Sequence, residues 1–216
     1  MKFDYRTETI SDLIVRLRIP DQEGKYPVLL LLHGWTGDEN SMWIFESRLP
    51  QDNMILAPRG IYPSPLGGYG WRKSDRDRWP NMDDFTHAIN SINELISKKD
   101  LVQADFSRIN LVGFSQGAAL AYAFSIEYPN RVSAIAALSG FLPSDVESTI
   151  ENSNLNGLPI YITHGSQDEL VPVDRARYAV EALTQAGAKV SYCEEEVGHK
   201  LSATCFNGME SFFNSL

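Results

Sequence analysis

The chain has 216 residues, a mass of 24.2 kDa and a formal net charge of −9 at pH 7. This length fits one α/β domain, so we expect residues 1–216 to form a single domain. The acidic balance offers no basic field for phosphates, which argues against nucleic acid or an anionic membrane surface as a partner. The longest aliphatic run, residues 28–32, is too short to span a bilayer, so we expect no integral membrane association.

The cysteines and the first residues of the chain indicate the cellular compartment in which the protein is expected. The start, MKFDYRTETI, lacks the apolar core and small residues of a secretory signal, and the chain has no N-x-[ST] sequon. Cys193 and Cys205 are the two cysteines, and in a chain with a large core we expect both to be reduced. These features predict a cytoplasmic protein. No CxxC, HExxH or carboxylate-rich calcium loop occurs, so we expect neither a metal nor another cofactor.

The apolar pattern predicts a sheet. Residues 12–19 alternate, with apolar side chains at every second position, which indicates an antiparallel edge strand. Further along the chain, six short apolar runs do not alternate, as is typical of central strands covered on both faces. These runs are residues 28–32, 54–57, 109–113, 134–138, 158–163 and 190–193.

Helical segments separate these runs. Residues 83–96 repeat apolar positions with a period near 3.6, and the alanine-rich residues 116–127 stop before Pro129. Residues 174–186 carry one apolar face and end before Gly187, while Cys205 to Leu216 form the last amphipathic segment. Strands alternating with helices predict an α/β fold with a mostly parallel sheet, whose function lies at the carboxyl ends of its strands.

A nucleophile motif lies at one of these strand ends. Gly113-Phe114-Ser115-Gln116-Gly117 joins a buried run to the alanine-rich helix. A sharp strand-to-helix turn would hold Ser115 in a strained conformation, exposed at the positive end of the helix dipole. Side chains at positions 113 and 117 would collide with the turned backbone, which explains the two glycines. The competing interpretation is a glycine-rich turn with an incidental serine.

A serine nucleophile needs a base and an orienting carboxylate. Asp168 lies in the loop after one buried run, and His199 lies in the loop after the next, so the order Ser, acid, His follows the α/β-hydrolase arrangement. We therefore assign Ser115 as nucleophile, Asp168 as acid and His199 as base. Alternatives remain at each position: His164 as base, and Glu169 or Asp145 as acid, whereas His87 is expected on a solvated helix face.

The pieces HGWTGDENSM, GFSQGAALAY, ALSGFLP, THGSQDELVPVDRA and EVGHKLS together resemble the phospholipase/carboxylesterase family, which includes acyl-protein thioesterases and bacterial carboxylesterases. The resemblance covers nearly the whole chain from Val28 onward. It implies a compact α/β-hydrolase without a large lid domain that acts on ester or thioester bonds. It also places the triad at Ser115, Asp168 and His199, in agreement with the reading of the residues.

The resemblance further implies an oxyanion hole. One backbone N–H would come from Gln116, after the nucleophile, and the other from Trp35, in the loop HGWTGDEN. We expect His33, at the head of that loop, to bond to backbone and preserve the loop's shape.

The loop 58–80 is long, glycine-rich and aromatic, so we expect it to form a wall of the substrate pocket. Our candidates within it are Tyr69, Trp71 and Arg72. Thioesterase-type members often carry Trp-Phe-Asp here, whereas this chain continues from Trp71 to Arg72 and Lys73. The basic cluster Arg72, Lys73, Arg76 and Arg78 either recognises a substrate carboxylate or phosphate, or is neutralised by Asp75 and Asp77 in a solvated loop.

The sequence thus predicts a serine hydrolase that cleaves carboxylic ester, thioester or lysophospholipid bonds in small-molecule substrates through an acyl-enzyme. A dienelactone-hydrolase-like enzyme is the nearest rival, but it would usually carry a cysteine at position 115. A peptidase would commonly need an added lid or propeller domain. A non-catalytic binding module with the same fold is the alternative from another class.

Overall fold

The computed structural model describes residues 2–73, 78–97 and 101–216. Three members of the expected charged loop, Asp75, Arg76 and Asp77, lie outside the described residues.

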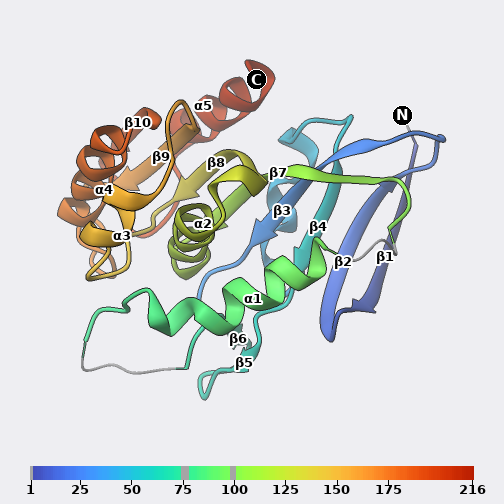
Figure 1. The fold of residues 1–216 in the computed structure, drawn as a ribbon, viewed down its shortest axis with the longest axis horizontal. Helices are drawn as coiled ribbons and strands as arrows, with labels where there is room; N and C mark the ends of the chain where they lie inside the picture. Colours follow the sequence, from blue (N-terminus) through green and yellow to red (C-terminus); the bar gives the residue numbers. More distant parts are fainter. Residues whose placement is uncertain (1, 74–77, 98–100) are drawn as a thin grey trace.

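An eight-stranded sheet runs through the molecule in the order β1-β2-β4-β3-β7-β8-β9-β10 (Figure 1). Strands β3, β4, β7, β8, β9 and β10 are parallel to one another, whereas β1 and β2 are joined by antiparallel pairing. The predicted, mostly parallel sheet is confirmed. The strands are β1 (Phe3–Ile10), β2 (Leu13–Pro20), β3 (Tyr26–Leu32), β4 (Met54–Pro58), β7 (Ala104–Phe114), β8 (Val132–Leu138), β9 (Pro159–Gly165) and β10 (Lys189–Glu195).

The alternating segment forms β2 and is antiparallel, but its predicted place at the sheet edge is wrong. Strand β1 lies outside it, joined through a turn in which Ser11 and Asp12 have φ values of 50° and 64°. The sequence did not indicate β1 because most of its side chains are polar and exposed, so no hydrophobic alternation marks it.

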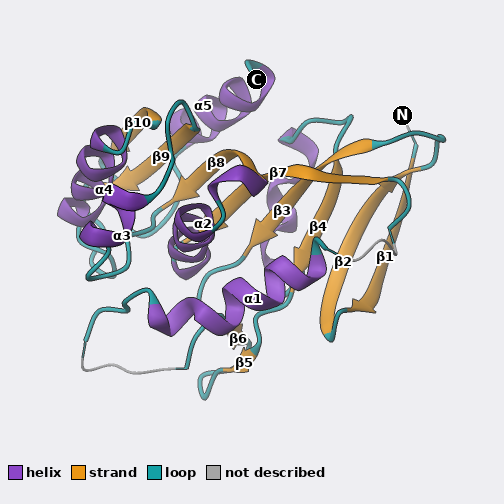
Figure 2. Ribbon diagram, in the orientation of Figure 1, coloured by secondary structure: helices purple, strands orange, loops and turns teal. Residues whose placement is uncertain are grey.

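Helices cover both faces of the sheet, as Figure 2 shows. The four predicted helices occur as α1 (Thr86–Leu95), α2 (Gln116–Glu127), α4 (Val173–Gln185) and α5 (Ala203–Asn214). Shorter elements had no clear sequence signal. They are the helix α3 (Glu147–Asn152), the 3₁₀ helices η1 (Ser41–Arg48), η2 (Asp83–Phe85) and η3 (Pro129–Arg131), and the small strands β5 (Tyr62–Pro63) and β6 (Tyr69–Gly70).

Strand β3 explains why the sheet has a core on each face. Val28, Leu30 and Leu32 belong to the larger core, which also contains the buried side chains of α1, α2 and α4. Leu29 and Leu31 point the other way, into a smaller core with residues of η1 and α5. Successive strand side chains alternate between faces, so an unbroken aliphatic run serves two cores at once.

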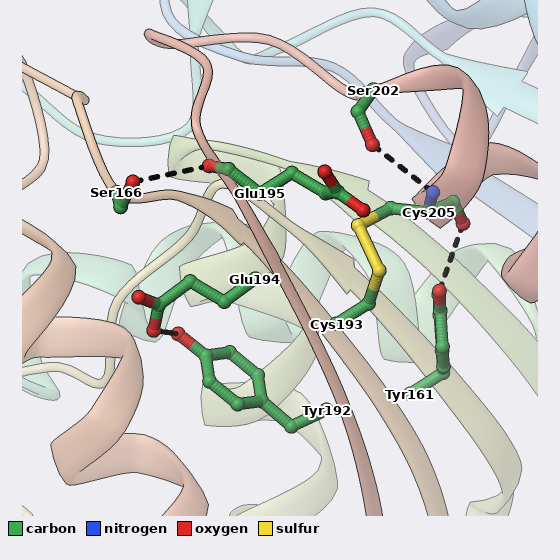
Figure 3. The surroundings of a disulfide bond; sticks show 8 residues. All are labelled: Tyr161, Ser166, Tyr192, Cys193, Glu194, Glu195, Ser202 and Cys205. Atoms are coloured by element: carbon green, nitrogen blue, oxygen red, sulfur yellow. Dashed lines mark hydrogen bonds between the residues drawn. A yellow bond between two sulfur atoms is a disulfide. The ribbon is translucent and has the colours of Figure 1, made fainter.

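The expectation that the two cysteines are reduced is wrong. Cys193, in β10, and Cys205, in α5, form a disulfide with a Cα–Cα distance of 5.7 Å (Figure 3). The Tyr161 hydroxyl donates a hydrogen bond of 2.8 Å to the Cys205 carbonyl, so the first turn of α5 is also tied to β9. Core size indicates whether a chain needs a cross-link, but the turn that brings β10 back to α5 decides whether the sulfurs can meet.

Candidate active site

Ser115 occupies the turn between β7, which ends at Phe114, and α2, which begins at Gln116. Its φ of 53° and ψ of −114° are a strained conformation for a residue with a side chain. A Cβ on Gly113 would meet the backbone of Gly117, and one on Gly117 would meet the Leu32 carbonyl. The predicted requirement for both glycines is confirmed, and the turn places Ser115 at the N-terminus of α2.

Asp168 follows β9 and is 7% exposed. Its Oδ1 atom accepts hydrogen bonds from the backbone N–H groups of Leu170 and Val171, each at 2.9 Å. These two donors fix the carboxylate's orientation and leave Oδ2 directed at another partner.

That partner is His199, whose Nδ1 donates to Asp168 Oδ2 at 2.6 Å. The loops that carry the two residues are themselves joined, because the Ser166 amide donates to the Glu195 carbonyl at 2.8 Å and the Gln167 amide to the Val197 carbonyl at 3.1 Å. Figure 3 shows a further contact between these loops beside the disulfide, the hydrogen bond of 3.3 Å that the Ser166 hydroxyl donates to the same Glu195 carbonyl. Asp168 and His199 are therefore held together by backbone as well as by side chains.

The competing residues lie elsewhere. His164 is buried, its Nε2 donates to the Val171 carbonyl at 2.8 Å, and burial lowers the pKa of its imidazole. Its Nε2 lies 3.4 Å from Asp168 Oδ2, so it packs behind the carboxylate that His199 contacts at 2.6 Å. Glu169 and Asp145 are both exposed. His87 is exposed on α1, as expected, and its Nδ1 lies 2.8 Å from the Tyr62 hydroxyl.

His33 has both ring nitrogens engaged by backbone, as predicted. Nδ1 donates to the Gly34 carbonyl at 2.7 Å, and Nε2 accepts from the Gly60 amide at 2.8 Å. One donor and one acceptor define a neutral imidazole, and burial lowers the pKa of His33, which favours that form. The ring thus joins the loop after β3 to the loop after β4.

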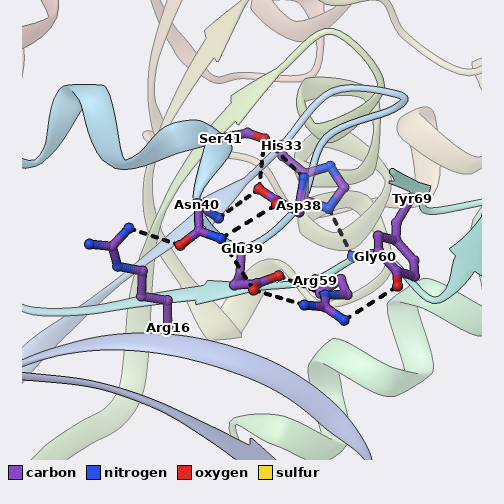
Figure 4. A network of polar contacts seen from close by, with 9 residues as sticks. All are labelled: Arg16, His33, Asp38, Glu39, Asn40, Ser41, Arg59, Gly60 and Tyr69. Atoms are coloured by element: carbon purple, nitrogen blue, oxygen red, sulfur yellow. Dashed lines mark hydrogen bonds and ion pairs between the residues drawn. The ribbon is translucent and has the colours of Figure 1, made fainter. Parts of the chain in front are cut away.

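An ion pair supports the same connection, as Figure 4 shows. Arg59 donates from Nε to Glu39 Oε2 at 2.6 Å and from Nη2 to Oε1 at 2.8 Å. These hydrogen bonds hold the pKa of Glu39 below its usual value. The guanidinium also lies 4.7 Å from the ring centre of Tyr69. Sequence reasoning missed this pair, because nothing in the spacing of an acidic and a basic residue 20 positions apart indicates contact.

The structure places the three pocket candidates differently. Arg72 lines a cavity of about 840 Å³ that also contains Ser115, Gln116 and His199. Trp71 is 0% exposed, and its Nε1 donates to the His33 carbonyl at 2.8 Å, so it supports the loop after β3 from the interior and does not form the cavity wall. Tyr69 lies beside Arg59, outside the wall formed by the described residues.

Trp79, from the loop 58–80, also lines the cavity, as expected of that loop. Phe141, Leu170 and Val171 line it without a sequence signal, and they come from two segments that only the fold brings together. Arg78 also lines the cavity, and it forms a bidentate ion pair with Asp84 at 2.7 and 2.9 Å. Its charge is thus balanced by Asp84, whereas the expected pairing with Asp75 and Asp77 lies outside the described residues.

In the parts of the chain that the structure describes, no group of three or more His, Cys, Asp or Glu side chains is arranged to hold a metal ion. Within the same parts, no helix has the length and apolar character needed to cross a bilayer.

A mostly parallel sheet with a serine at its strand-to-helix turn and a linked Asp–His pair defines an α/β-hydrolase. The sequence profile of the phospholipase/carboxylesterase family matches residues 19–216, and the chain belongs to this family. Carboxylic ester hydrolysis by a serine hydrolase is the activity that this membership assigns to the chain.

Known relatives agree with this placement. The chain is 24% identical to an acyl-protein thioesterase 1 of Eremothecium gossypii, with 93% of this chain and 92% of the relative covered. It is 30% identical to the Kluyveromyces lactis protein of the same name, over 68% and 71% of the two chains. In fold it is similar to the Bacillus cereus carboxylesterase, with a TM-score of 0.77, 21% identity and 94% of each chain covered.

Proposed function

We propose that Ser115, His199 and Asp168 form a catalytic triad that cleaves carboxylic esters and thioesters through an acyl-enzyme. The observation that carries the proposal is the 2.6 Å hydrogen bond from His199 to Asp168, in a protein whose Ser115 lines the same cavity as His199. Asp168 would hold the imidazole with its proton on Nδ1, which leaves Nε2 as the base.

In the first half-reaction, Ser115 Oγ attacks the carbonyl carbon and its proton passes to His199 Nε2. The tetrahedral intermediate then loses the alcohol or thiol, which departs with that proton. In the second half-reaction, water attacks the acyl-enzyme and gives a proton to His199, which returns it to Ser115 Oγ as the carboxylic acid leaves. The backbone N–H groups of Trp35 and Gln116 would stabilise the oxyanion in both halves, and each such donor is worth about 3 kcal/mol.

Two features of the loop after β3 support its role in the oxyanion hole. A Cβ on Gly34 would lie 3.0 Å from the Phe114 ring and 3.4 Å from Ser115 Cβ, so this loop passes directly beside the nucleophile. His33 and the Glu39–Arg59 pair anchor both ends of the same loop. A donor that is fixed before the reaction costs no reorganisation in the transition state.

The acyl-enzyme predicts a pre-steady-state burst. On mixing with excess p-nitrophenyl acetate, about one equivalent of p-nitrophenol per protein should appear before the slower steady state, provided that deacylation limits turnover. A thioester of p-nitrothiophenol tests the second substrate class in the same way. A binding module would bind these compounds without releasing the nitrophenol, and that result would overturn the proposal.

We also propose that residues 1–216 work as one domain, since the sheet takes strands from Phe3 to Glu195. The cytoplasmic location expected from the sequence stays a prediction. The Cys193–Cys205 disulfide argues against it, because such bonds persist mainly in oxidising compartments. Fractionation of the cells that produce the protein would distinguish a cytoplasmic location from an oxidising compartment.

A further inference from the structure

A second cavity adjoins the one that contains Ser115. It measures about 600 Å³ and lies between η1 and the segment from His199 into α5. The two cavities share Gly34, Trp35, Thr36, Phe114 and His199, so they meet at the loop after β3 and the candidate base. The distinguishing wall residues of the second cavity are mainly apolar: Met42, Ile44, Phe45, Leu201, Ala203 and Phe206.

We propose that this second cavity binds the leaving group of the substrate, an apolar alkyl or aryl alcohol or thiol, while the cavity that contains Ser115 binds the acyl group. The inference rests on the proposed function and specifies its substrate: an ester or thioester with an apolar group on each side of the scissile bond. The loop 58–80 predicted as a pocket wall is not part of the second cavity among the described residues.

The assignment of the two groups follows from the bonds that each half-reaction breaks. The acyl group stays bonded to Ser115 Oγ until water releases it, so it must occupy the cavity that Ser115 itself lines. The leaving group never bonds to Ser115, but its oxygen or sulfur must receive a proton from His199. The second cavity lacks Ser115 among its described walls, contains His199, and continues from it along Leu201 to α5.

Packing against neighbouring side chains holds the walls of the second cavity in place. Phe45 and Phe206 pack with ring centres 5.6 Å apart, and Met42 and Phe45 are buried in the smaller core. The ring of Phe114 lies 5.0 Å from that of His199 at the junction of the two cavities. At the rim, Ile44 is 76% exposed. An exposed aliphatic side chain at the mouth of an apolar cavity gains burial when an apolar group enters.

The other cavity offers a matched residue, because Leu66 lines it and is 65% exposed. Ile44→Ser and Leu66→Ser therefore remove similar apolar side chains from the two cavities, and neither change disturbs a buried core. Hexyl acetate and ethyl hexanoate form a matched substrate pair: they are isomers, but one carries its long chain on the alcohol and the other on the acyl group.

The test measures kcat/KM for both isomers and for ethyl acetate by titration of the released acid. Ile44→Ser should lower kcat/KM for hexyl acetate by roughly fivefold to tenfold and leave ethyl hexanoate unchanged, and Leu66→Ser should do the reverse. Ala203→Trp, which fills the second cavity, should lower the rate for hexyl acetate much more than for ethyl acetate.

Three results would contradict the assignment: equal losses for both isomers, the mirror-image pattern, or no effect of Ala203→Trp on hexyl acetate. In each case hydrolysis of ethyl acetate continues, so the proposed function survives while the leaving-group cavity does not. Absence of hydrolysis for every ester, together with no labelling of Ser115 by a fluorophosphonate, would overturn the proposed function itself.

Discussion

His199 Nδ1 donates to Asp168 Oδ2 at 2.6 Å, while Asp168 Oδ1 is held by the amides of Leu170 and Val171. The two backbone donors therefore orient the carboxylate independently of its hydrogen bond to the imidazole. This arrangement selects one tautomer of His199 and leaves Nε2 without a proton in the neutral ring.

Asp168→Asn should lower kcat for p-nitrophenyl acetate by about 10⁴-fold with little change in KM, the loss known for the equivalent change in a serine protease triad. The amide can keep accepting from Leu170 and Val171, but its NH₂ group would face His199 Nδ1 and favour the wrong tautomer. Asp145→Asn serves as the control because Asp145 is exposed. Similar losses in both variants would contradict the assigned acid.

Glu39→Gln should lower kcat roughly tenfold and leave KM nearly unchanged. The variant weakens the ion pair with Arg59 that anchors the loop of the proposed oxyanion donor Trp35, so its effect should fall short of the loss of a whole donor, about 10²-fold or more. Glu210→Gln removes another arginine pair, the one with Arg48, at the surface and should keep full activity. A rise in KM alone would indicate a role in substrate binding instead.

Acidification should destabilise the fold through His33 and His164. Burial lowers the pKa of both side chains in the folded protein, so they stay neutral there while the unfolded chain takes up protons near pH 6.5. The unfolded state then binds more protons, and the free energy of unfolding falls as the pH drops below about 6.5. Glu39, with its depressed pKa, adds a further loss at still lower pH as it protonates in the folded state.

Urea unfolding at several pH values between about 8 and 5 measures this slope. His33→Gln can keep one donor and one acceptor in the loop and should give a shallower slope, whereas the exposed His87→Gln should leave the slope unchanged. An unaltered slope in the His33 variant would contradict the assignment of that residue as neutral in the fold.

The disulfide should stabilise the region around His199. Cys193 and Cys205 are 12 residues apart and enclose the segment that carries His199. Closing a loop of this length is worth roughly 3 kcal/mol in chain entropy, so the double variant Cys193→Ser/Cys205→Ser should lose about that much free energy of unfolding. Dithiothreitol should destabilise the wild-type protein to a similar extent and leave the double variant unaffected. If the wild-type protein responds to the dithiol no more than the double variant does, the bond is absent in solution.

The sheet and its four main helices could be predicted because central strands and amphipathic helices carry strong hydrophobic periodicity. Strand β1 and helix η1 were not predicted because their hydrophobic patterns are weak. Most positions of β1 are polar, and η1 buries only Met42 and Phe45. The disulfide was not predicted for a different reason. Its formation depends on where α5 returns to the sheet, and the sequence does not encode that position in any local pattern.

At the site, the order Ser, Asp, His identified the candidate triad because each residue follows its own strand. The cavities were harder to foresee. Trp71 looked like a pocket aromatic, yet its indole donates to the His33 carbonyl in the interior. Phe206, with no chemical motif around it, lines the second cavity through the position of α5. Side chains that act by packing depend on tertiary contacts that no motif records.

The most direct test of the central claim is the site at which a fluorophosphonate labels the protein. Peptide mass mapping after labelling should find the phosphonyl adduct on Ser115, and Ser115→Ala should be neither labelled nor active toward p-nitrophenyl acetate. An adduct on another residue, or undiminished turnover by the Ser115→Ala variant, would contradict the account.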